Sequence, residues 1–263
     1  SNGKKTVSTE KTIGNVKYTF DDRGVAQDSW VHNSDKGTWK YYGDEEEPKL
    51  HTGWFEAVPS KELNSDDHEN GTTHWYYANS KGEITIPTAD GEVGVVKTID
   101  GKSYLFNSDG EMVTGLRILT YDGSKITNIS SEVDTADTVK NMNSDTMKLV
   151  YFESNGAAKT GTTTITLDGT SYTFSFKSNG SPRGVGETGI SDGYIYQNGL
   201  RLTADEDTKY GVVTYKNESY VVNEKGSIQK NKKNLKDADE TYYCTNAKGI
   251  LLHSSTEKCT TKH

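Results

Sequence analysis

Apolar residues are scarce in this sequence: only 31 % of its 263 residues are hydrophobic. Leu, Ile, Val and Phe are too few to fill one thick core. No apolar run approaches the length that a membrane span requires, so we expect no transmembrane segment. The net charge of -8 excludes the basic stripe of a nucleic-acid-binding surface. An initiating Met and a signal peptide are also missing, so we expect a processed or excised part of a longer chain.

Cysteine is nearly absent, with Cys244 and Cys259 as the two examples. A hydrophilic chain rich in Tyr and Thr is typical of secreted proteins, in which cysteines pair. We therefore expect a disulfide between them, which would stabilise the fold by about 3 kcal/mol on the chain-entropy model. Two free thiols are the alternative.

Tyrosine and glycine are plentiful instead, with 16 Tyr and 26 Gly against 4 Pro. This composition is not that of a disordered chain, and it favours many thin β layers that bury aromatic rings. The stretch HWYYANSKGEI (74–84) is nearly repeated 28 residues later as KSYLFNSDGEM (102–112), with Gly110 in the place of Gly82. A repeated aromatic strand followed by an Asx–Gly turn predicts a repeated β-hairpin.

Alignment on the turn glycine extends this repeat along the chain. From Gly156 to Gly249 the steps are 24, 19, 27 and 23 residues, a period typical of solenoids. WKYYGDEEEPKLHTGW fits as a copy with two extra residues in its turn. The other copies are VKYTFDDRGVAQDSW (Gly24), HWYYANSKGEI (Gly82), SYLFNSDGEMVTGL (Gly110), LVYFESNGAAKTGT (Gly156), YTFSFKSNGSP (Gly180), GYIYQNGLRL (Gly199), SYVVNEKGSIQ (Gly226) and TYYCTNAKGIL (Gly249).

The sequence thus predicts an all-β fold, an elongated solenoid of stacked hairpins of about 20–25 residues each. We interpret residues 1–263 as a single array of about nine degenerate repeats. Insertions interrupt it near 56–73 and 117–147, and the second contains either a degenerate hairpin or a loop with one helical turn near 134–142. Residues 241–263 are expected to cap the last hairpin, with the disulfide holding the tail over its aromatic face.

The repeat resembles the cell-wall-binding (choline-binding) repeat of Gram-positive surface proteins, G-x-W-Y-Y-x-N-x-x-G-x-M-x-T-G-W. Residues 75–79 with Gly82 match its first half, residues 107–115 match its second half, and residues 52–54 match its end. Similar repeats form the glucan-binding regions of streptococcal glucosyltransferases and the C-terminal arrays of clostridial toxins. The resemblance implies an extracellular protein, associated with the cell surface or cell wall.

In that family the ligand site is an aromatic cage between consecutive hairpins, in which ring quadrupoles attract a quaternary ammonium. The resemblance implies a cage in the first three copies. The expected ligand-binding residues are Trp30, Trp39, Tyr42, Trp54, Trp75 and Tyr77.

The later repeats are expected to keep the fold without the site. At the positions equivalent to the cage tryptophans stand Leu116, Thr162, Ser103, Leu149 and Ser219, which cannot line a cage. Their tyrosines are expected to serve as core instead, with Tyr104 and Tyr151 buried between hairpins.

Signals for catalysis or metal binding are weak. The histidines do not form a metal-binding spacing, and the pair His68 and His74 is more typical of a solvated loop. Adjacent aspartates such as Asp66 and Asp67 point apart, which argues against a glycosidase pair. We expect no enzyme activity, no metal and no cofactor in this chain, although it could target a catalytic domain elsewhere.

Two functions follow from these observations. The first is a non-catalytic module that binds choline or carbohydrate of the cell wall or other glycans through its aromatic cages. The alternative is a stalk or adhesin scaffold of a larger surface protein without a ligand of its own. Exposure of the tryptophan ring faces distinguishes them. The sequence does not indicate the oligomeric state.

Overall fold

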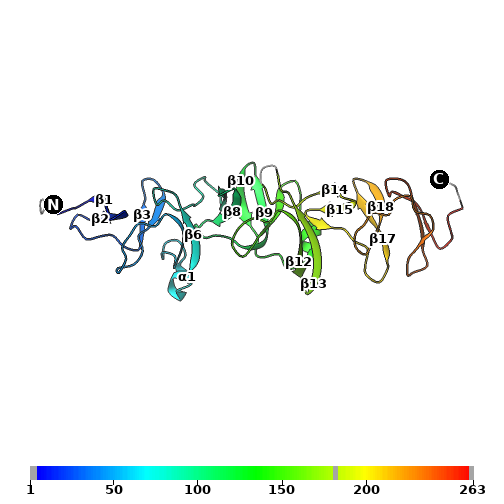
Figure 1. Cartoon of the computed structure of the whole chain (residues 1–263), viewed down its shortest axis with the longest axis horizontal. Coiled ribbons are helices and arrows are strands. Elements are labelled where there is room, and N and C mark those ends of the chain that lie inside the picture. Colours follow the sequence, from blue (N-terminus) through cyan, green and yellow to red (C-terminus); the bar gives the residue numbers. More distant parts are fainter. Residues whose placement is uncertain (1–4, 180–182, 261–263) are drawn as a thin grey trace. The chain divides into compact units, whose positions relative to one another are not determined.

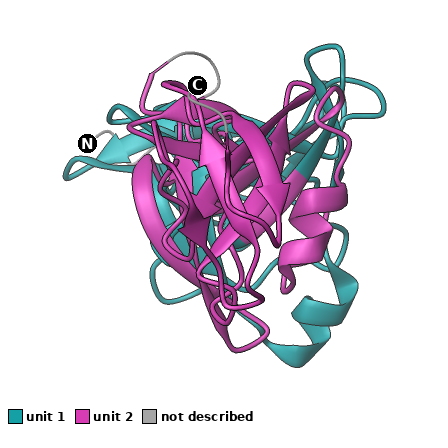
Figure 2. Cartoon of the chain, turned by 90° about the vertical axis from the view of Figure 1, so that its right-hand side faces the viewer, with its two compact units in different colours: residues 1–115, 119–129, 152–157 teal, residues 116–118, 130–151, 158–263 magenta. Residues whose placement is uncertain are grey.

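The protein is nearly all β, which confirms the expected fold class. In the computed structural model, which describes residues 5–179 and 183–260, the helices are α1 and α2, of six residues each. The chain divides into two compact units (Figure 2). Unit 1 comprises Ser1–Gly115, Leu119–Ile129 and Phe152–Ala157, and unit 2 comprises Leu116–Ile118, Ser130–Tyr151 and Ala158–His263. Gly180, the turn glycine of one expected copy, and residues 261–263 of the expected cap lie outside the described residues.

Unit 1 is built from hairpins of strands that are neighbours in sequence (Figure 1). Strands β1 and β2, β3 and β4, β5 and β6, and β7 and β8 pair antiparallel. Its elements are β1 (Thr9–Ile13), β2 (Val16–Phe20), β3 (Trp30–Asn33), β4 (Thr38–Tyr41), β5 (Gly53–Ala57), α1 (Ser65–Asn70), β6 (His74–Ala78), β7 (Gly94–Ile99), β8 (Lys102–Asn107) and β10 (Lys125–Ile129). Strands β9 (Gly115–Asp122) and β11 (Met147–Phe152) have residues in both units.

Unit 2 continues with antiparallel pairs of β12 with β13, β14 with β15, β15 with β16, β17 with β18, and β20 with β21. Its elements are α2 (Ala136–Asn141), β12 (Gly161–Leu167), β13 (Thr170–Phe176), β14 (Gly189–Ser191), β15 (Tyr194–Gln197), β16 (Leu200–Arg201), β17 (Tyr210–Tyr215), β18 (Glu218–Asn223), β19 (Leu235–Lys236), β20 (Tyr242–Thr245) and β21 (Leu251–Ser255).

The turn after the aromatic strand is built in the same way in several copies. Oδ1 of Asn107 accepts hydrogen bonds from the backbone N–H groups of Asp109 (3.0 Å) and Glu111 (2.8 Å). Gly110 adopts a φ of +79° and donates its N–H to the Asn107 carbonyl. This conformation favours Asn or Asp at the first position and Gly three residues later, as the repeat predicts. The same two side-chain bonds recur at Asp21, Asn79, Asn223 and Asn246.

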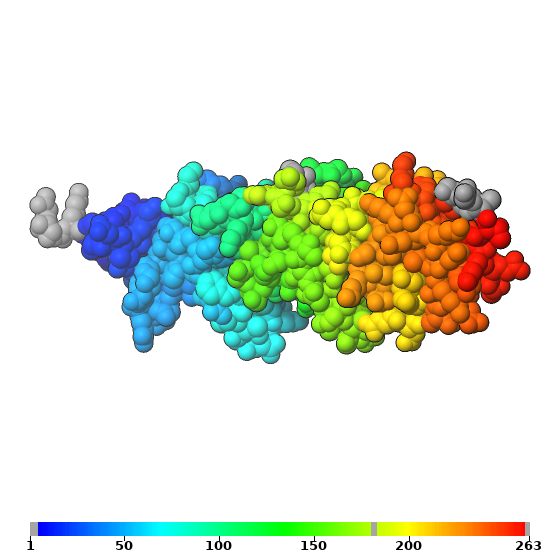
Figure 3. Space-filling model, turned by 45° about the vertical axis from the view of Figure 1, so that its right-hand side comes forward, coloured from blue at the N-terminus to red at the C-terminus, as the bar shows by residue number. Residues whose placement is uncertain are grey.

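Consecutive hairpins of unit 1 contact each other through the residues that follow the turn. The N–H of Ile84 donates to the Trp39 carbonyl at 3.0 Å, and the N–H of Met112 donates to the Trp75 carbonyl at 2.8 Å. A Cβ placed on Gly110 would lie 2.8 Å from Cδ1 of Ile84, so this turn packs against the preceding repeat. Within each unit, successive stretches of chain follow one another across the surface in sequence order (Figure 3). The hairpins of β3–β4, β5–β6 and β7–β8 are therefore linked one to the next by hydrogen bonds and turn packing.

Both interruptions of the repeat contain regular structure. Helix α1 lies in the first, where the Asn64 side chain accepts from the Asp67 N–H and Gly71 ends the helix in the left-handed conformation. In the second, β9 and β10 form an irregular hairpin and α2 follows. For residues 117–147 the sequence predicts either a degenerate hairpin or a loop with one helical turn. The structure contains an irregular hairpin and a short helix in this segment.

Aromatic and aliphatic side chains form separate thin cores in the two units. Phe55 and Tyr76 are 5 % and 0 % exposed in unit 1, and Phe174 and Phe176 are both 0 % exposed in unit 2. The expectation that Tyr104 and Tyr151 are buried between hairpins is wrong, because both rings are only partly buried. Tyr104 lies on a hairpin face that reaches solvent, and Tyr151 packs at the margin of the core around α2.

The C-terminal strands are held to the preceding loop. Cys244 and Cys259 form a disulfide with Cα atoms 6.5 Å apart. The N–H of Cys259 donates to Oδ1 of Asn234 at 2.8 Å. The sequence predicts that the tail covers the last hairpin. Instead, the first part of the tail is the second strand of that hairpin, because β21 pairs along β20. The strand pairing gives hydrogen bonds to backbone N–H and C=O groups that a loosely folded cover would leave without partners.

Candidate functional site

The hairpin of β5 and β6 presents aromatic rings on both of its faces. Trp54 lies directly opposite Tyr77, and Phe55 lies directly opposite Tyr76. Because successive side chains of a strand point to opposite faces, the first pair occupies one face and the second pair the other. This alternation explains why three aromatic residues follow one another in the HWYYA strand: the middle ring enters the core, and the flanking rings Trp75 and Tyr77 face the other way.

The face of Trp54 and Tyr77 meets two rings from the next hairpin. The Trp54 ring contacts Tyr77 at 5.2 Å and Tyr104 at 4.8 Å between centroids, both edge-on, at 67° and 62°. Phe106, which is 0 % exposed, stacks against Trp54 at 5.8 Å and forms the floor. We call Trp54, Tyr77 and Tyr104 the Trp54 cage. All three rings are half-buried, so part of each ring is exposed to solvent.

The preceding hairpins form an equivalent arrangement, which we call the Trp30 cage: Trp30, Tyr41 and Tyr76. Trp30 contacts Tyr41 at 4.9 Å, directly across the strand pair, and Tyr76 edge-on at 4.9 Å and 69°. Phe55 stacks on Tyr41 at 5.3 Å and 5°, and Nε1 of Trp30 donates to the Val58 carbonyl at 2.8 Å. Tyr76 and Phe55 are buried, whereas Trp30 and Tyr41 are half-buried, so the protein's own rings pack one side of this cage.

The two cages differ at one equivalent position. In the Trp30 cage, the residue directly opposite Tyr76 is Phe55. In the Trp54 cage, the residue directly opposite Tyr104 is Lys97, and its Nζ lies 5.7 Å from the centroid of the Tyr77 ring. The Trp54 cage therefore already has a cation at its edge.

The Trp30 cage has no charge of its own at neutral pH. Burial, followed by the charge of Asp44, raises the pKa of Tyr41. Burial, followed by the charge of Lys49, lowers the pKa of His51, whose ring lies 5.1 Å from that of Tyr41. Both groups are thus neutral at pH 7, whereas Lys97 contributes a positive charge to the Trp54 cage.

The structure does not bring the six expected ligand-binding residues together in one site. Trp39 is 8 % exposed and Tyr42 is 2 % exposed, so neither presents a ring face to solvent. Trp39 stacks on His32 at 4.2 Å, and the Tyr42 hydroxyl accepts a hydrogen bond from Thr19. Trp75 is 46 % exposed and lies opposite Glu56, two residues from Tyr77 on the same face. The remaining three divide between the cages, with Trp30 in one and Trp54 and Tyr77 in the other.

Sequence reasoning missed Tyr104, Phe106 and Lys97, which complete the Trp54 cage. The sequence predicts Tyr104 as core because the family's cage is built around tryptophan, and Tyr104 lies in a repeat without one. The repeat itself contains the signal that would have found it. Tyr76 and Tyr104 each precede the turn asparagine by three residues, and both meet a tryptophan edge-on, at 69° and 62°.

One tyrosine pair in unit 2 is covered by a cation of the chain itself. The guanidinium carbon of Arg201 lies 3.9 Å above the Tyr194 ring and 5.5 Å from that of Tyr196. Its Nη2 also donates to the Tyr196 hydroxyl at 2.9 Å. An external cation would have to displace this guanidinium, so the arrangement acts as structure rather than as a site.

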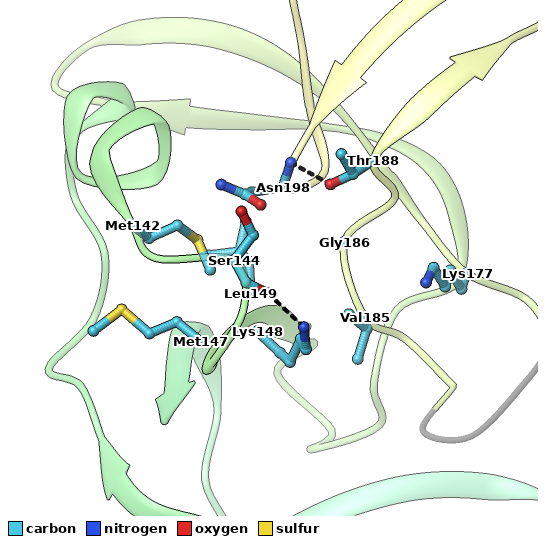
Figure 4. A pocket seen from close by; sticks show the side chains of 10 residues that line it. All are labelled: Met142, Ser144, Met147, Lys148, Leu149, Lys177, Val185, Gly186, Thr188 and Asn198. Carbon is cyan, nitrogen blue, oxygen red and sulfur yellow. Dashed lines mark hydrogen bonds between the residues drawn. The ribbon is translucent and has the colours of Figure 1, made fainter. Parts of the chain in front are cut away.

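Unit 2 also contains a hollow of about 350 Å³ beside α2 (Figure 4). Met142, Met147 and Leu149 line its apolar part, and Asn198 donates its N–H to the Thr188 hydroxyl at 2.9 Å. The residues that line it include neither an aromatic ring nor a carboxylate. It therefore lacks the groups that attract a quaternary ammonium.

Comparison with known proteins shows the fold. Neither a protein-family model nor a curated protein matches the sequence. Among solved structures, choline-binding protein F of Streptococcus pneumoniae in its crystal form II aligns with a TM-score of 0.50, at 20 % identity, over 90 % of this chain and 61 % of that chain. The structure of CbpF in complex with ipratropium, obtained by soaking, aligns with a TM-score of 0.51, at 20 % identity, over 90 % and 63 %.

The resemblance to the choline-binding repeat is therefore confirmed as a likeness of fold. This chain spans less than two thirds of the length of either choline-binding protein. Within the described part of the chain, both helices are far too short to cross a bilayer.

Proposed function

We propose that this chain is a choline-binding module of the choline-binding repeat family, and that the Trp54 cage is its ligand site. The observation that carries the proposal is the geometry of this cage. Rings from two consecutive hairpins meet edge-on around a buried phenylalanine floor and remain partly exposed to solvent. The likeness of fold to choline-binding proteins supports it.

The chemistry of the cage suits a trimethylammonium group. Each ring face attracts a cation with about 0.5–2 kcal/mol, and it offers apolar area to the methyl groups. Three such contacts approach the roughly 4.1 kcal/mol that corresponds to a dissociation constant of about 1 mM. We expect millimolar affinity or somewhat better for a single site.

The other hairpins, in this proposal, form a scaffold. We infer that they stack as a solenoid in each unit, because the turn of one repeat packs on the next and hydrogen bonds link them. The Trp30 cage is packed with its own rings, and Arg201 covers the tyrosine pair in unit 2. We further infer an extracellular, wall-associated, non-catalytic module that can attach a larger protein to a choline-bearing surface.

Isothermal titration calorimetry tests the choline proposal with three small ligands. Choline is expected to bind, whereas ethanolamine, which lacks the methyl groups, and 3,3-dimethylbutan-1-ol, its uncharged analogue, are each expected to bind at least tenfold more weakly. Equal binding of the uncharged analogue would contradict a cation site. Binding of a wall glycan without choline would instead support the carbohydrate function. No binding of any ligand would support a stalk or adhesin scaffold without a ligand of its own.

Lys97 is expected to weaken choline binding at this site. Two like charges about 6 Å apart repel with roughly 0.7 kcal/mol in water and up to about 2.8 kcal/mol at an effective dielectric of 20. Replacing Lys97 with methionine should therefore strengthen choline binding at least threefold and should reduce its dependence on salt. Lys102→Met, on the same hairpin at an exposed position, serves as the matched control. Unchanged affinity in Lys97→Met would remove Lys97 from the site.

A further inference from the structure

The link that contains α1 places a histidine and two carboxylates from different elements side by side. Asp67 lies in α1, His74 begins β6, and Glu111 follows the turn after β8. Nε2 of His74 is 2.9 Å from Oδ2 of Asp67 and 3.7 Å from Oε1 of Glu111. The ligand atoms of all three residues lie within 4.8 Å of one another. His68 does not take part, since its Nδ1 lies 2.8 Å from the Pro59 carbonyl oxygen.

Two asparagine side chains hold the carboxylates in place. Nδ2 of Asn64 donates to Oδ2 of Asp67 at 2.9 Å and to Oε1 of Glu111 at 3.0 Å. Nδ2 of Asn107 donates to the other oxygen of Glu111 at 2.9 Å. Outer hydrogen bonds of this kind orient the ligands of a metal site before the metal arrives. Glu111 is 7 % exposed, so a carboxylate that is usually solvated is here enclosed.

A buried hydroxyl provides a second, independent sign of a ligand. Tyr76 is 0 % exposed, and its hydroxyl has no hydrogen-bond partner in the described part of the chain. It shares a strand face with His74, two residues away. A buried polar group without a partner is rare in proteins and needs an explanation.

We propose that Asp67, His74 and Glu111 form a binding site for a divalent transition-metal ion, with Zn²⁺ as the best fit. An imidazole and two carboxylates are a ligand set that zinc accepts. Metal–ligand bonds of about 2.0–2.2 Å in a tetrahedron place ligand atoms roughly 3.2–3.6 Å apart. The distances from Nε2 of His74, 2.9 Å and 3.7 Å, bracket this range. Water takes the fourth position, and the Tyr76 hydroxyl is the buried group available to bond it.

The role of the ion follows from where its ligands lie. It would fasten the inserted α1 segment to its own hairpin and to the turn of the next one, since its ligands come from both. The two carboxylates, Asp67 and Glu111, favour a cation here. The three ligands belong to neither aromatic cage, and Tyr76 is shared with the Trp30 cage only through its ring. The proposal holds whether or not the Trp54 cage binds choline.

The test is titration of the full, tag-free chain with ZnCl₂ after removal of metals. Calorimetry should give one saturable site, Zn²⁺ should raise the unfolding temperature by several degrees, and Co²⁺ should give the intense visible absorption of a tetrahedral site. His74→Gln and Glu111→Gln should each weaken Zn²⁺ binding at least tenfold. Both amides keep the size of the group, and the amide oxygen introduced by Glu111→Gln would still accept from Asn64 or Asn107, so circular dichroism should be unchanged.

Matched controls distinguish this site from surface binding. Glu83→Gln removes the equivalent turn glutamate of the preceding repeat, which Asn79 holds in the same way. His68→Gln removes the neighbouring histidine. Both should bind Zn²⁺ like the unmodified chain. The proposal is overturned if no saturable site is found, or if the two controls weaken binding as much as His74→Gln and Glu111→Gln.

Discussion

Replacing Trp54 with alanine is expected to weaken choline binding at least tenfold. Trp54 is the one ring that contacts all other members of its cage, Tyr77, Tyr104 and the Phe106 floor. Its removal takes away the strongest cation–π partner, about 1–2 kcal/mol, and lets water into the cage. A loss of about 1.4 kcal/mol is tenfold in the dissociation constant. Calorimetric titration with choline measures the effect.

Two further variants separate binding from folding. Trp54 packs against Phe106, so Trp54→Ala should also reduce the free energy of unfolding, by about 2 kcal/mol for a half-buried ring. Trp54→Phe keeps an aromatic ring in the core contact and should retain most of the stability with an intermediate affinity. Trp75→Ala should change the affinity for choline less than threefold, because the Trp75 ring is 46 % exposed and is not part of the Trp54 cage. A Trp54→Ala protein that folds and still binds choline normally would contradict the assignment of the site.

Replacing Gly110 with alanine is expected to reduce the free energy of unfolding of unit 1 by about 2–5 kcal/mol. Two effects add. The residue has a φ of +79°, which costs a residue with a Cβ about 1–2 kcal/mol. The new Cβ would also lie 2.8 Å from Cδ1 of Ile84 and 3.3 Å from the Thr85 carbonyl oxygen, and such overpacking costs about 1–3 kcal/mol.

Gly91→Ala is the matched control for the second effect. Its φ of +74° is nearly the same, but a Cβ there would have no neighbour within 4 Å. We expect a cost of about 1–2 kcal/mol, from the backbone alone. Denaturant unfolding followed by tryptophan fluorescence reports on unit 1 selectively, because all four tryptophans lie in it. Equal costs for both variants would show that the turn does not pack against the preceding repeat.

The repeated turn made the fold predictable from sequence. An Asn or Asp with a Gly three residues later forms the same local hydrogen bonds wherever it occurs, so its effect does not depend on distant parts of the chain. The hairpin strands follow from this turn and from the aromatic pattern before it. The helix α1 was not predicted, because its six residues carry little periodicity and its capping by Asn64 is a short-range signal.

The site was predicted less well because burial is set by which strand face meets which neighbour. Trp39 and Trp75 have equivalent positions opposite His32 and Glu56, yet one is 8 % and the other 46 % exposed. Residue type alone could not distinguish them. The cluster around His74 could not be found at all, since Glu111 is 37 residues away in sequence and meets it only through the stacking of hairpins.

Choline binding at the Trp54 cage is tested most directly by ¹H–¹⁵N NMR. The tryptophan indole signals are followed while choline is added. Four indole signals are expected, one for each tryptophan. The Trp54 signal, assigned by its loss in Trp54→Phe, is expected to shift most and to saturate, while the buried Trp39 signal stays in place. A saturable shift at another tryptophan with Trp54 unmoved, or no shift at any of them, would contradict choline binding at this cage.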